Sequence, residues 1–400
     1  MHILITADGR SPITQNWIHS VLKLGYQVTL VSTYPCEDLP GVENTIRFPV
    51  AFGGFASAGR TSGGMRRMIR GFRPLIQLFR NSFAPTMMRN AGHRFQKLLE
   101  GIKPDLVHAL RIPYEGILAS HTPPGIPLVV TIWGNDLTLH APASRGLGRW
   151  TRQTLQRADA LLADARRDIR LAVQWGFDPS HPTMVLPGSG GVDLDRIKTV
   201  AGEPLQSPHT RDIPRDDTWI INPRGIRAYA RTDVFFQSIP LLLNRWQNVR
   251  FLCTGMAGRN EADVWVQRLK LQDRVHLLPV LPQEELWRLF QRSMISLSIT
   301  EHDGTPNTLL EAMACGCLPI AGDLETLREW ITPGVNGLLV NPCQPQGVAD
   351  GMMLALTNPS FVRKAAEMNE KIILERADCR EVQSMLGTFY NSIHTVCSIL

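Results

Sequence analysis

The sequence predicts an α/β protein of two domains, each built on a doubly wound parallel sheet. The chain has 400 residues, 44% of them hydrophobic, which is enough for two or three domains with sizeable cores. Short apolar runs alternate with amphipathic segments, as is typical of strand–helix units in a parallel sheet. The alternation weakens over residues 196–217 and then restarts. We therefore expect an N-terminal domain over 1–200, a C-terminal domain over 201–380 and a terminal helix over 381–400.

The N-terminal half contains four apolar runs that we predict to be strands, at residues 1–7, 27–33, 105–110 and 127–134. Between the first two runs, residues 14–26 have apolar side chains at helical spacing and lead to Gly25, which predicts a helix that ends there. Residues 151–176 carry the signals of a helix, a strand and a second helix.

The C-terminal half follows a stretch, residues 203–217, that is rich in Pro, Ser and charge and is typical of a linker. Six apolar runs after it are predicted strands: 218–222, 249–255, 274–278, 294–300, 317–322 and 337–340. Helical spacing is clear at 284–290 and 309–314. Because ligands of doubly wound sheets bind beyond the carboxyl ends of the strands, we expect the site in the loops there, at a cleft between the domains.

The basic charge of the chain is concentrated in one segment. The formal net charge is +6, and no Asp or Glu lies between Glu43 and Glu100. Ten basic residues lie in this segment: Arg47, Arg60, Arg66, Arg67, Arg70, Arg73, Arg80, Arg89, Arg94 and Lys97. Met, Ile, Leu and Phe are interleaved with them, so the segment suits either an anionic membrane surface or an ordinary helix with a solvated basic face. No nucleic-acid recognition motif accompanies it, and we expect no nucleic-acid partner.

The compartment is expected to be the reducing cytoplasm. The seven cysteines are scattered, without the spacing of a disulfide framework or a zinc site. The first residues lack the long apolar run of a signal peptide, and no run of about 18 apolar residues predicts a membrane span.

The most informative segment is residues 298–323, SITEHDGTPNTLLEAMACGCLPIAGD. A predicted strand leads through a short loop into a helix, which we expect to be capped by Thr305, to begin at Pro306 and to end at Gly316. The free N–H groups at such a helix start form an anion site. Asp303 and Glu311, with seven residues between them, add two carboxylates that accept hydrogen bonds from sugar or ribose hydroxyls.

This segment resembles the signature of retaining family 4 glycosyltransferases, with Asp303 in the place of the more common Glu. The resemblance implies the GT-B fold, in which two Rossmann-like domains face a cleft and the C-terminal one binds a nucleoside diphosphate sugar. It implies that Asp303 contacts the donor sugar and takes part in catalysis, and that Glu311 contacts the ribose. The backbone around Gly304, Thr305, Asn307 and Thr308 would hold sugar hydroxyls and phosphate. No metal or other cofactor is expected.

Other segments resemble the family in the same order along the chain. The loop after the strand 218–222 would supply Arg224 to the diphosphate, with Arg231 as the nearest replacement for the family's Lys and Arg227 as the second. The backbone at Val280 would hold the base. Gly9 occupies the place of the family's phosphate-side glycine loop, although a lone glycine is more often only a turn.

The N-terminal half departs from the family at one position. Trp133 stands where many members have a His that touches the donor sugar, and an indole N–H can only donate a hydrogen bond. A similar Trp-Gly form occurs in the surface-polysaccharide members, so Trp133 remains a candidate sugar contact. His108, at the end of a predicted strand, is a second candidate, although a His there is more often structural.

Together these features predict a hexosyltransferase of cell-surface polysaccharide or glycolipid synthesis. It would move a sugar with retention from a nucleoside diphosphate sugar to a sugar or lipid-linked acceptor, in the cytoplasm or peripherally on the inner face of the membrane. Two alternatives remain: a nucleotide-sugar epimerase on the same fold, and a non-catalytic nucleotide-sugar binding protein.

Overall fold

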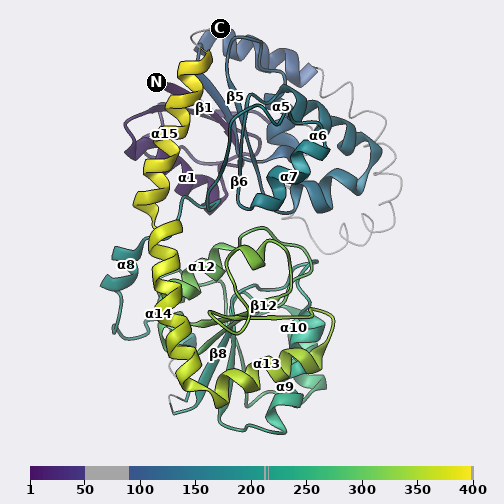
Figure 1. Cartoon of the computed structure of the whole chain (residues 1–400), viewed down its shortest axis with the longest axis vertical. Coiled ribbons are helices and arrows are strands. Elements are labelled where there is room, and N and C mark those ends of the chain that lie inside the picture. Colours follow the sequence, from purple (N-terminus) through teal and green to yellow (C-terminus); the bar gives the residue numbers. More distant parts are fainter. Residues whose placement is uncertain (50–89, 211–212, 215, 398–400) are drawn as a thin grey trace. The chain divides into compact units, whose positions relative to one another are not determined.

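The computed structural model describes residues 1–49, 90–210, 213–214 and 216–397 (Figure 1). The chain divides into two compact units. Unit 1 consists of Met1–Gly190 and Gln383–Leu400, and unit 2 of Gly191–Val382. The chain thus changes units at Gly190, ten residues before the boundary at 200 expected from the sequence, and returns near the expected start of the terminal helix. Most of the basic segment, from Arg60 to Arg89, lies outside the described residues.

Unit 1 is built on a seven-stranded sheet with the order β3-β2-β1-β4-β5-β6-β7, and all of its pairings are parallel. The strands are β1 His2–Ala7, β2 Gln27–Ser32, β3 Asn44–Arg47, β4 Leu106–Ala109, β5 Leu128–Ile132, β6 Ala160–Ala163 and β7 Thr183–Val185. β1 is central and almost entirely buried, because its continuous apolar run can be covered on both faces. Ile5 pairs in register with Leu30 on one side and with His108 on the other.

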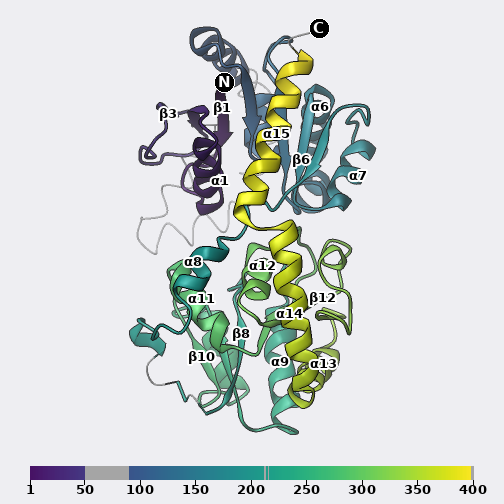
Figure 2. The same cartoon turned by 60° about the vertical axis from the view of Figure 1, so that its left-hand side comes forward.

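The helices of unit 1 come from both of the stretches of chain that make up this unit. Residues 90–102 are also helical. The other helices and helical turns are α1 Pro12–Lys23, Ile112–Gly116, α5 Ile117–Ala119, Asp136–His140, Ala141–Ala143, α6 Arg145–Arg157, α7 Arg166–Gln174 and α15 Cys379–Cys397. α15, labelled in Figure 2, belongs to unit 1 from Gln383 onward. Its Tyr390 is fully buried there.

Unit 2 is built on a six-stranded parallel sheet with the order β10-β9-β8-β11-β12-β13. The strands are β8 Thr218–Asn222, β9 Val249–Cys253, β10 Val275–Leu277, β11 Ile295–Ser298, β12 Leu318–Gly322 and β13 Leu338–Val340. After β8 the chain adds β9 and β10 on one side, and then crosses to add β11 on the other side. The carboxyl ends of β8 and β11 therefore form the switch point at which such sheets bind ligands.

The helices of unit 2 are α8 Leu194–Thr199, Pro208–Thr210, α9 Thr232–Leu243, α10 Asn260–Arg268, α11 Gln283–Arg292, α12 Asn307–Ala314, Leu327–Glu329, α13 Pro345–Thr357 and α14 Pro359–Arg376. The core on one face is dominated by α9, whose Phe235, Phe236 and Ile239 are buried with Phe251 of β9. The other core contains α11 and α12, with Trp287, Phe290 and Leu310. The two parallel α/β sheets confirm the predicted fold class.

One local expectation about α12 is wrong. The helix begins at Asn307, with Pro306 as the residue before it, and Thr305 does not cap it. The Thr305 hydroxyl instead accepts a hydrogen bond from the indole Nε1 of Trp330 at 2.9 Å. The expected end is confirmed, because Gly316 follows the helix with a φ of +87°.

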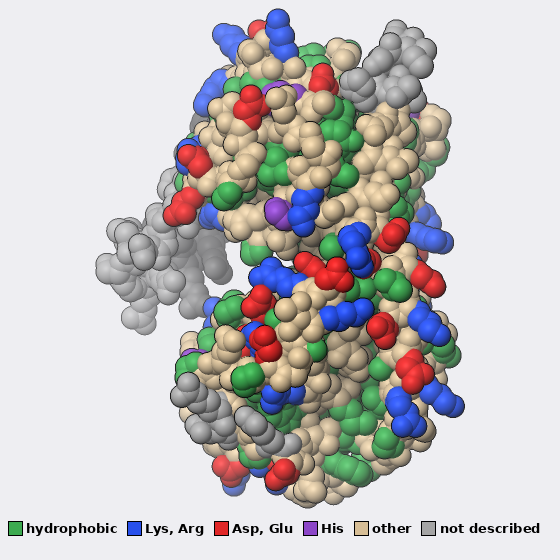
Figure 3. Space-filling model, turned by 90° about the vertical axis from the view of Figure 1, so that its left-hand side faces the viewer, with side chains coloured by type: hydrophobic (Ala, Val, Ile, Leu, Met, Phe, Trp, Pro, Cys, Tyr) green, Lys and Arg blue, Asp and Glu red, His purple; other side chains and the backbone are tan. Residues whose placement is uncertain are grey.

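The surface gives two further facts. No helix in the part of the chain that the structure describes combines the length and apolar character needed to cross a bilayer. On the face shown in Figure 3, acidic and basic side chains are interspersed over the described surface of both units.

Candidate functional site

The loops at the carboxyl ends of β8 and β11 bring three predicted residues together. Arg224, in the loop after β8, donates from Nη2 to Asp303 Oδ2 at 2.6 Å. The same guanidinium lies 3.4 Å from the hydroxyl of Thr308, in the first turn of α12. The side chains of Arg224 and Asp303 are each only 11% exposed, so this ion pair is shielded from bulk water.

The electrostatics of Asp303 reflect its burial. Loss of hydration raises the pKa of this carboxyl, while Arg224 and the backbone N–H of Gly304 act to lower it. A hydrogen bond from the hydroxyl of Thr326 to the backbone carbonyl of Asp303, at 3.1 Å, helps to fix the loop that contains Asp303. Position 322 requires a glycine, because a Cβ on this residue would lie only 2.4 Å from the carbonyl oxygen of Thr300, just before the loop.

The N-terminus of α12 faces the same loop. Pro306 brings no N–H, and Leu309 N bonds back to Pro306 O at 2.9 Å. Among the described residues, the backbone N–H groups of Asn307 and Thr308 bond to no acceptor. Two N–H groups at the positive end of a helix dipole, beside Arg224, suit a phosphate oxygen.

Glu311 lies one turn further along α12. Its Oε1 accepts a hydrogen bond from Gln283 Nε2, at the start of α11, at 2.7 Å. Burial raises the pKa of Glu311 to about 7, and the hydrogen bond from Gln283 opposes the shift. The group is thus close to half-ionised near neutral pH, and a ligand hydroxyl that donates to it would favour the carboxylate. Gln283 was not identified from the sequence, because its partner is 28 residues away.

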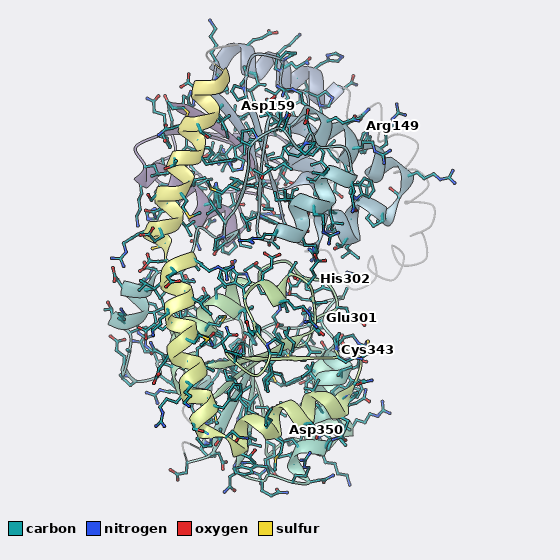
Figure 4. The ribbon with its side chains drawn as sticks, in the orientation of Figure 1. Arg149, Asp159, Glu301, His302, Cys343 and Asp350 are labelled. Carbon is teal, nitrogen blue, oxygen red and sulfur yellow. The ribbon has the colours of Figure 1, made fainter. Side chains whose placement is uncertain are left out.

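The other two arginines that follow β8, Arg231 and Arg227, have hydrogen-bond partners other than Asp303. Arg231 forms ion pairs with Asp233 at 2.8 Å and with Glu301 at 2.7 Å. The thiol of Cys343 lies 3.2 Å from the same Glu301 carboxylate, and Figure 4 shows both residues. Arg231 is therefore not joined to the Arg224–Asp303 pair, and a diphosphate would have to compete for it with two carboxylates. Arg227 is exposed, and its Nε donates to the carbonyl of Arg224 at 3.1 Å.

A cavity of about 380 Å³ adjoins Arg224 in unit 2. Its lining comes from the loops after β8, β9 and β10 and from α11, and comprises Pro223, Arg224, Gly225, Ile226, Arg227, Thr254, Gly255, Arg259, Val280, Leu281 and Leu286. This lining contains three arginines and no carboxylate, which suits an anionic ligand. Val280, predicted to lie beside the base, is on the rim and is 87% exposed.

The candidates in unit 1 occupy three different settings. Gly9 packs against the loop after β2, where a Cβ would lie 2.6 Å from Cys36 Sγ, and it lines a surface pocket with Arg10. Trp133 follows β5, and the Arg111 guanidinium lies 5.4 Å from its ring centre. The indole N–H of Trp133 is buried and has no described partner.

His108 lies in the core of unit 1 and not at a binding surface. It is fully buried, with Nδ1 2.7 Å from the Tyr390 hydroxyl and Nε2 2.7 Å from the Thr131 hydroxyl. Burial lowers the pKa of this imidazole to about 3. Both ring nitrogens are occupied, which gives His108 the structural role that is more common for a His on a strand.

A polar cluster after β4 and β5 was not identified from the sequence. Asp136 accepts hydrogen bonds from Arg111 Nη2 at 2.9 Å and from the backbone N–H groups of Ile112 and Trp133. Glu115 is buried, and burial raises its pKa to about 7. The backbone between these groups is strained, with φ of 152° at Arg111 and 69° at Tyr114. The feature of the sequence that could have indicated these polar residues is their position after the predicted strands 105–110 and 127–134.

Two parallel Rossmann-like sheets, with an arginine, a carboxylate and a helix start at the switch point of the second, are features that suit a protein with a nucleotide-linked ligand. Two family models match the chain: "Glycosyl transferase 4-like domain" over residues 9–188 and "Glycosyl transferases group 1" over residues 208–373. The chain belongs to the group 1 glycosyltransferases and has the GT-B fold.

Curated relatives carry the same class of activity. The chain is 27% identical over 302 residues to the GDP-mannose:cellobiosyl-diphosphopolyprenol alpha-mannosyltransferase of Xanthomonas campestris, covering 72% of this chain and 73% of that protein. It is also 27% identical over 199 residues to the D-inositol 3-phosphate glycosyltransferase of Frankia alni, covering 47% and 48% of the two chains.

Solved structures share the fold over the whole chain. The sucrose-phosphate synthase of Thermosynechococcus elongatus matches with a TM-score of 0.75 at 14% identity, covering 99% of this chain and all of that one. Anabaena HepE in complex with UDP matches with a TM-score of 0.69 at 15% identity, covering 98% of this chain and 100% of that one.

Proposed function

We propose that this glycosyltransferase moves a hexose, with retention at the anomeric carbon, from a nucleoside diphosphate sugar to an acceptor hydroxyl. The observation that carries the proposal is the buried Arg224–Asp303 pair, set against the N-terminus of α12. The loops there bring together the guanidinium of Arg224, the two free N–H groups at the start of α12 and the carboxylate of Asp303. These groups match a ligand that has both a diphosphate and sugar hydroxyls.

The chemistry follows from the charges that this cluster provides. The bond between the anomeric carbon and the diphosphate oxygen breaks, and Arg224 with the α12 N–H groups stabilises the charge that develops on the diphosphate. The acceptor oxygen forms the new bond on the same face, and its proton passes to the departing phosphate oxygen. Because this phosphate oxygen takes the proton, no protein base is required at the acceptor. Asp303 would position the donor sugar by accepting hydrogen bonds from the hydroxyls of the sugar.

We further propose that this charge is met without a metal ion. Arg224, and Arg231 once it exchanges its carboxylate partners for phosphate, supply the positive charge. The described residues gather no group of three or more His, Cys, Asp or Glu that would hold a cation.

The acceptor is proposed to be a sugar or a lipid-linked sugar in cell-surface polysaccharide or glycolipid synthesis. The support is the Xanthomonas relative, whose name gives a polyprenol-linked acceptor. The uninterrupted basic charge from Arg47 to Lys97 would bring the enzyme to the anionic membrane surface that presents such an acceptor.

The test is product analysis. The purified chain is incubated with GDP-, UDP- and ADP-linked hexoses and an alkyl glycoside acceptor, with and without EDTA, and the new linkage is examined by NMR. We expect a linkage of the same anomeric configuration as the donor, formed equally with EDTA. An inverted linkage, or activity that vanishes with EDTA and returns with Mg²⁺, contradicts this mechanism.

Two other outcomes would identify the alternatives. Conversion of the donor to its epimer without transfer would make the protein a nucleotide-sugar epimerase. Donor binding without transfer or hydrolysis would make it a binding protein, in which Asp303 and Trp133 replace groups needed for turnover.

A further inference from the structure

Two glycines line the cavity beside Arg224. Gly225 and Gly255, in the loops after β8 and β9, have φ of 60° and 70°, a conformation that L side chains rarely adopt. A Cβ on Gly225 would lie 3.7 Å from the carbonyl oxygen of Gly255, so the two loops touch backbone to backbone. These two positions add no side chain to the lining, which leaves room beside Ile226 and Leu281 for a planar ring.

Val280 lies on the rim of this cavity. Its side chain is 87% exposed, although it is hydrophobic, and its Cγ2 lies 3.8 Å from the position of a Cβ on Gly255. In the described structure, neither the N–H nor the C=O of Val280 has a hydrogen-bond partner, since the bonds of this segment are made by Leu278 and Pro279. An N–H and a C=O on one residue can pair with a ring edge that presents an acceptor beside a donor. Guanine and uracil both have such an edge, so this backbone does not separate them.

Arg259 distinguishes the two bases. It precedes α10, lines the same cavity and is exposed, and its guanidinium makes no hydrogen bond or ion pair with the described residues. The other two arginines of the cavity are engaged near the phosphate end, Arg224 with Asp303 and Arg227 with the Arg224 carbonyl. Arg259 is therefore the cation of this lining that remains for the base.

A guanidinium fork selects for two adjacent acceptors. Guanine presents O6 and N7 side by side, which Arg engages in a bidentate manner. Adenine presents an amino group beside N7, and uracil presents N3–H on one side of O4 and a C–H on the other, so neither offers two adjacent acceptors. We propose that the donor is a guanosine diphosphate sugar, and that Arg259 is the residue that selects guanine. This inference rests on the proposed function, because it assigns the base of the nucleotide that the same site binds.

The experiment measures the dissociation constants of GDP, UDP and ADP by calorimetry, for the intact chain and for two variants. Arg259→Gln removes the fork while keeping an exposed polar side chain of similar length. Arg268→Gln is the matched control, since Arg268 is an exposed arginine of the same helix, stacks on Trp265 and does not line the cavity. Thermal unfolding of both variants checks that they fold.

We expect the wild-type chain to bind GDP roughly tenfold or more tightly than UDP or ADP, the discrimination of a bidentate Arg–guanine contact. Arg259→Gln should lose most of that preference, with GDP weakened to about the level of UDP and UDP little changed. Arg268→Gln should behave as wild type.

Three outcomes would overturn the assignment. Tighter binding of UDP or ADP than GDP removes guanine and leaves the transferase intact. Equal weakening of all three nucleotides by Arg259→Gln makes Arg259 a phosphate contact. If no nucleoside diphosphate binds, the proposed function fails, and this inference fails with it.

Discussion

At the scale of single residues, Glu311 combines two opposed roles. Its pKa rises from 4.5 in the unfolded chain to about 7 in the folded one, so the folded state holds more protons between these values. Its contribution to stability is complete below about pH 4.5 and is lost as the pH rises through 7. The ribose contact that the family resemblance implies for Glu311 would need the opposite state, because the ionised carboxylate has both oxygens available to accept hydrogen bonds.

We therefore predict that Glu311→Gln stabilises the chain and weakens nucleotide binding. At pH 8 the variant should gain up to about 3 kcal/mol, at 1.36 kcal/mol per pKa unit. Affinity for the preferred nucleoside diphosphate should fall about tenfold or more, the worth of a charged hydrogen bond. Urea unfolding at pH 5 and pH 8, with calorimetry, measures both effects. Unchanged affinity would remove Glu311 from the site.

Arg224 and Arg227 provide a matched pair three residues apart. Arg224 holds Asp303 in a buried ion pair, whereas Arg227 is exposed. We predict that Arg224→Lys, which keeps the charge but loses the fork, lowers kcat by about 10²–10³, whereas Arg227→Lys changes it little. Arg224→Ala should in addition destabilise the fold by about 3–5 kcal/mol, because the buried Asp303 carboxylate loses the cation that balances its charge. Equal losses of turnover in the two Lys variants would refute the assignment.

Within the predicted site, the residues of the continuous motif could be placed from their spacing, whereas Arg224, 79 residues before Asp303, was placed only by the resemblance to the family. Asp303, Thr308 and Glu311 follow one strand and share one loop and helix, so their spacing fixes their positions. Gln283, Glu115 and Asp136 were missed because their roles depend on contacts between segments far apart in the chain. Arg231 illustrates the same point, since its pairing with Glu301 spans 70 residues and no local pattern predicts it.

At the scale of elements, α15 is tied into unit 1 by a buried polar chain. The Tyr390 hydroxyl lies 2.7 Å from His108 Nδ1 and 3.4 Å from Trp17 Nε1, and His108 continues to Thr131. Apolar spacing predicted this helix but not its partners, because hydrophobic periodicity locates a buried face without saying what covers it.

Tyr390→Phe should lower the stability of unit 1 by about 1–3 kcal/mol, because it leaves two buried groups without a partner. Nucleotide affinity should not change, since the residues of the nucleotide cavity all belong to unit 2. The control is Tyr26→Phe, which removes a more exposed hydroxyl that bonds Asn391 of α15. Urea unfolding with calorimetry compares the two, and equal stability of both variants would contradict a structural role for the chain.

At the scale of the whole molecule, acidic and basic side chains are mixed on the face in Figure 3. The excess of positive charge comes from the segment between Glu43 and Glu100, which has basic residues and no Asp or Glu. We predict that the chain floats with anionic vesicles at low salt and less at high salt. Each Lys or Arg near an anionic leaflet contributes about 1 kcal/mol, screened within a Debye length. Changing Arg66, Arg67, Arg70 and Arg73 to Gln should abolish flotation. Absence of flotation in the wild type at low salt would leave an enzyme with a soluble acceptor.

The division of the chain into units also has a consequence for its synthesis. Unit 2 is one continuous stretch, whereas unit 1 needs both ends of the chain. Val192 and Asp378 pair within unit 2, so the two ends of the continuous stretch are fastened together. All of unit 2 therefore precedes Tyr390 in the chain, and the buried side chain of Tyr390 belongs to the core of unit 1. The nucleotide cavity can thus form before the domain that was made first is complete, and chains that end before Gln383 should retain nucleotide binding with an unfinished first domain.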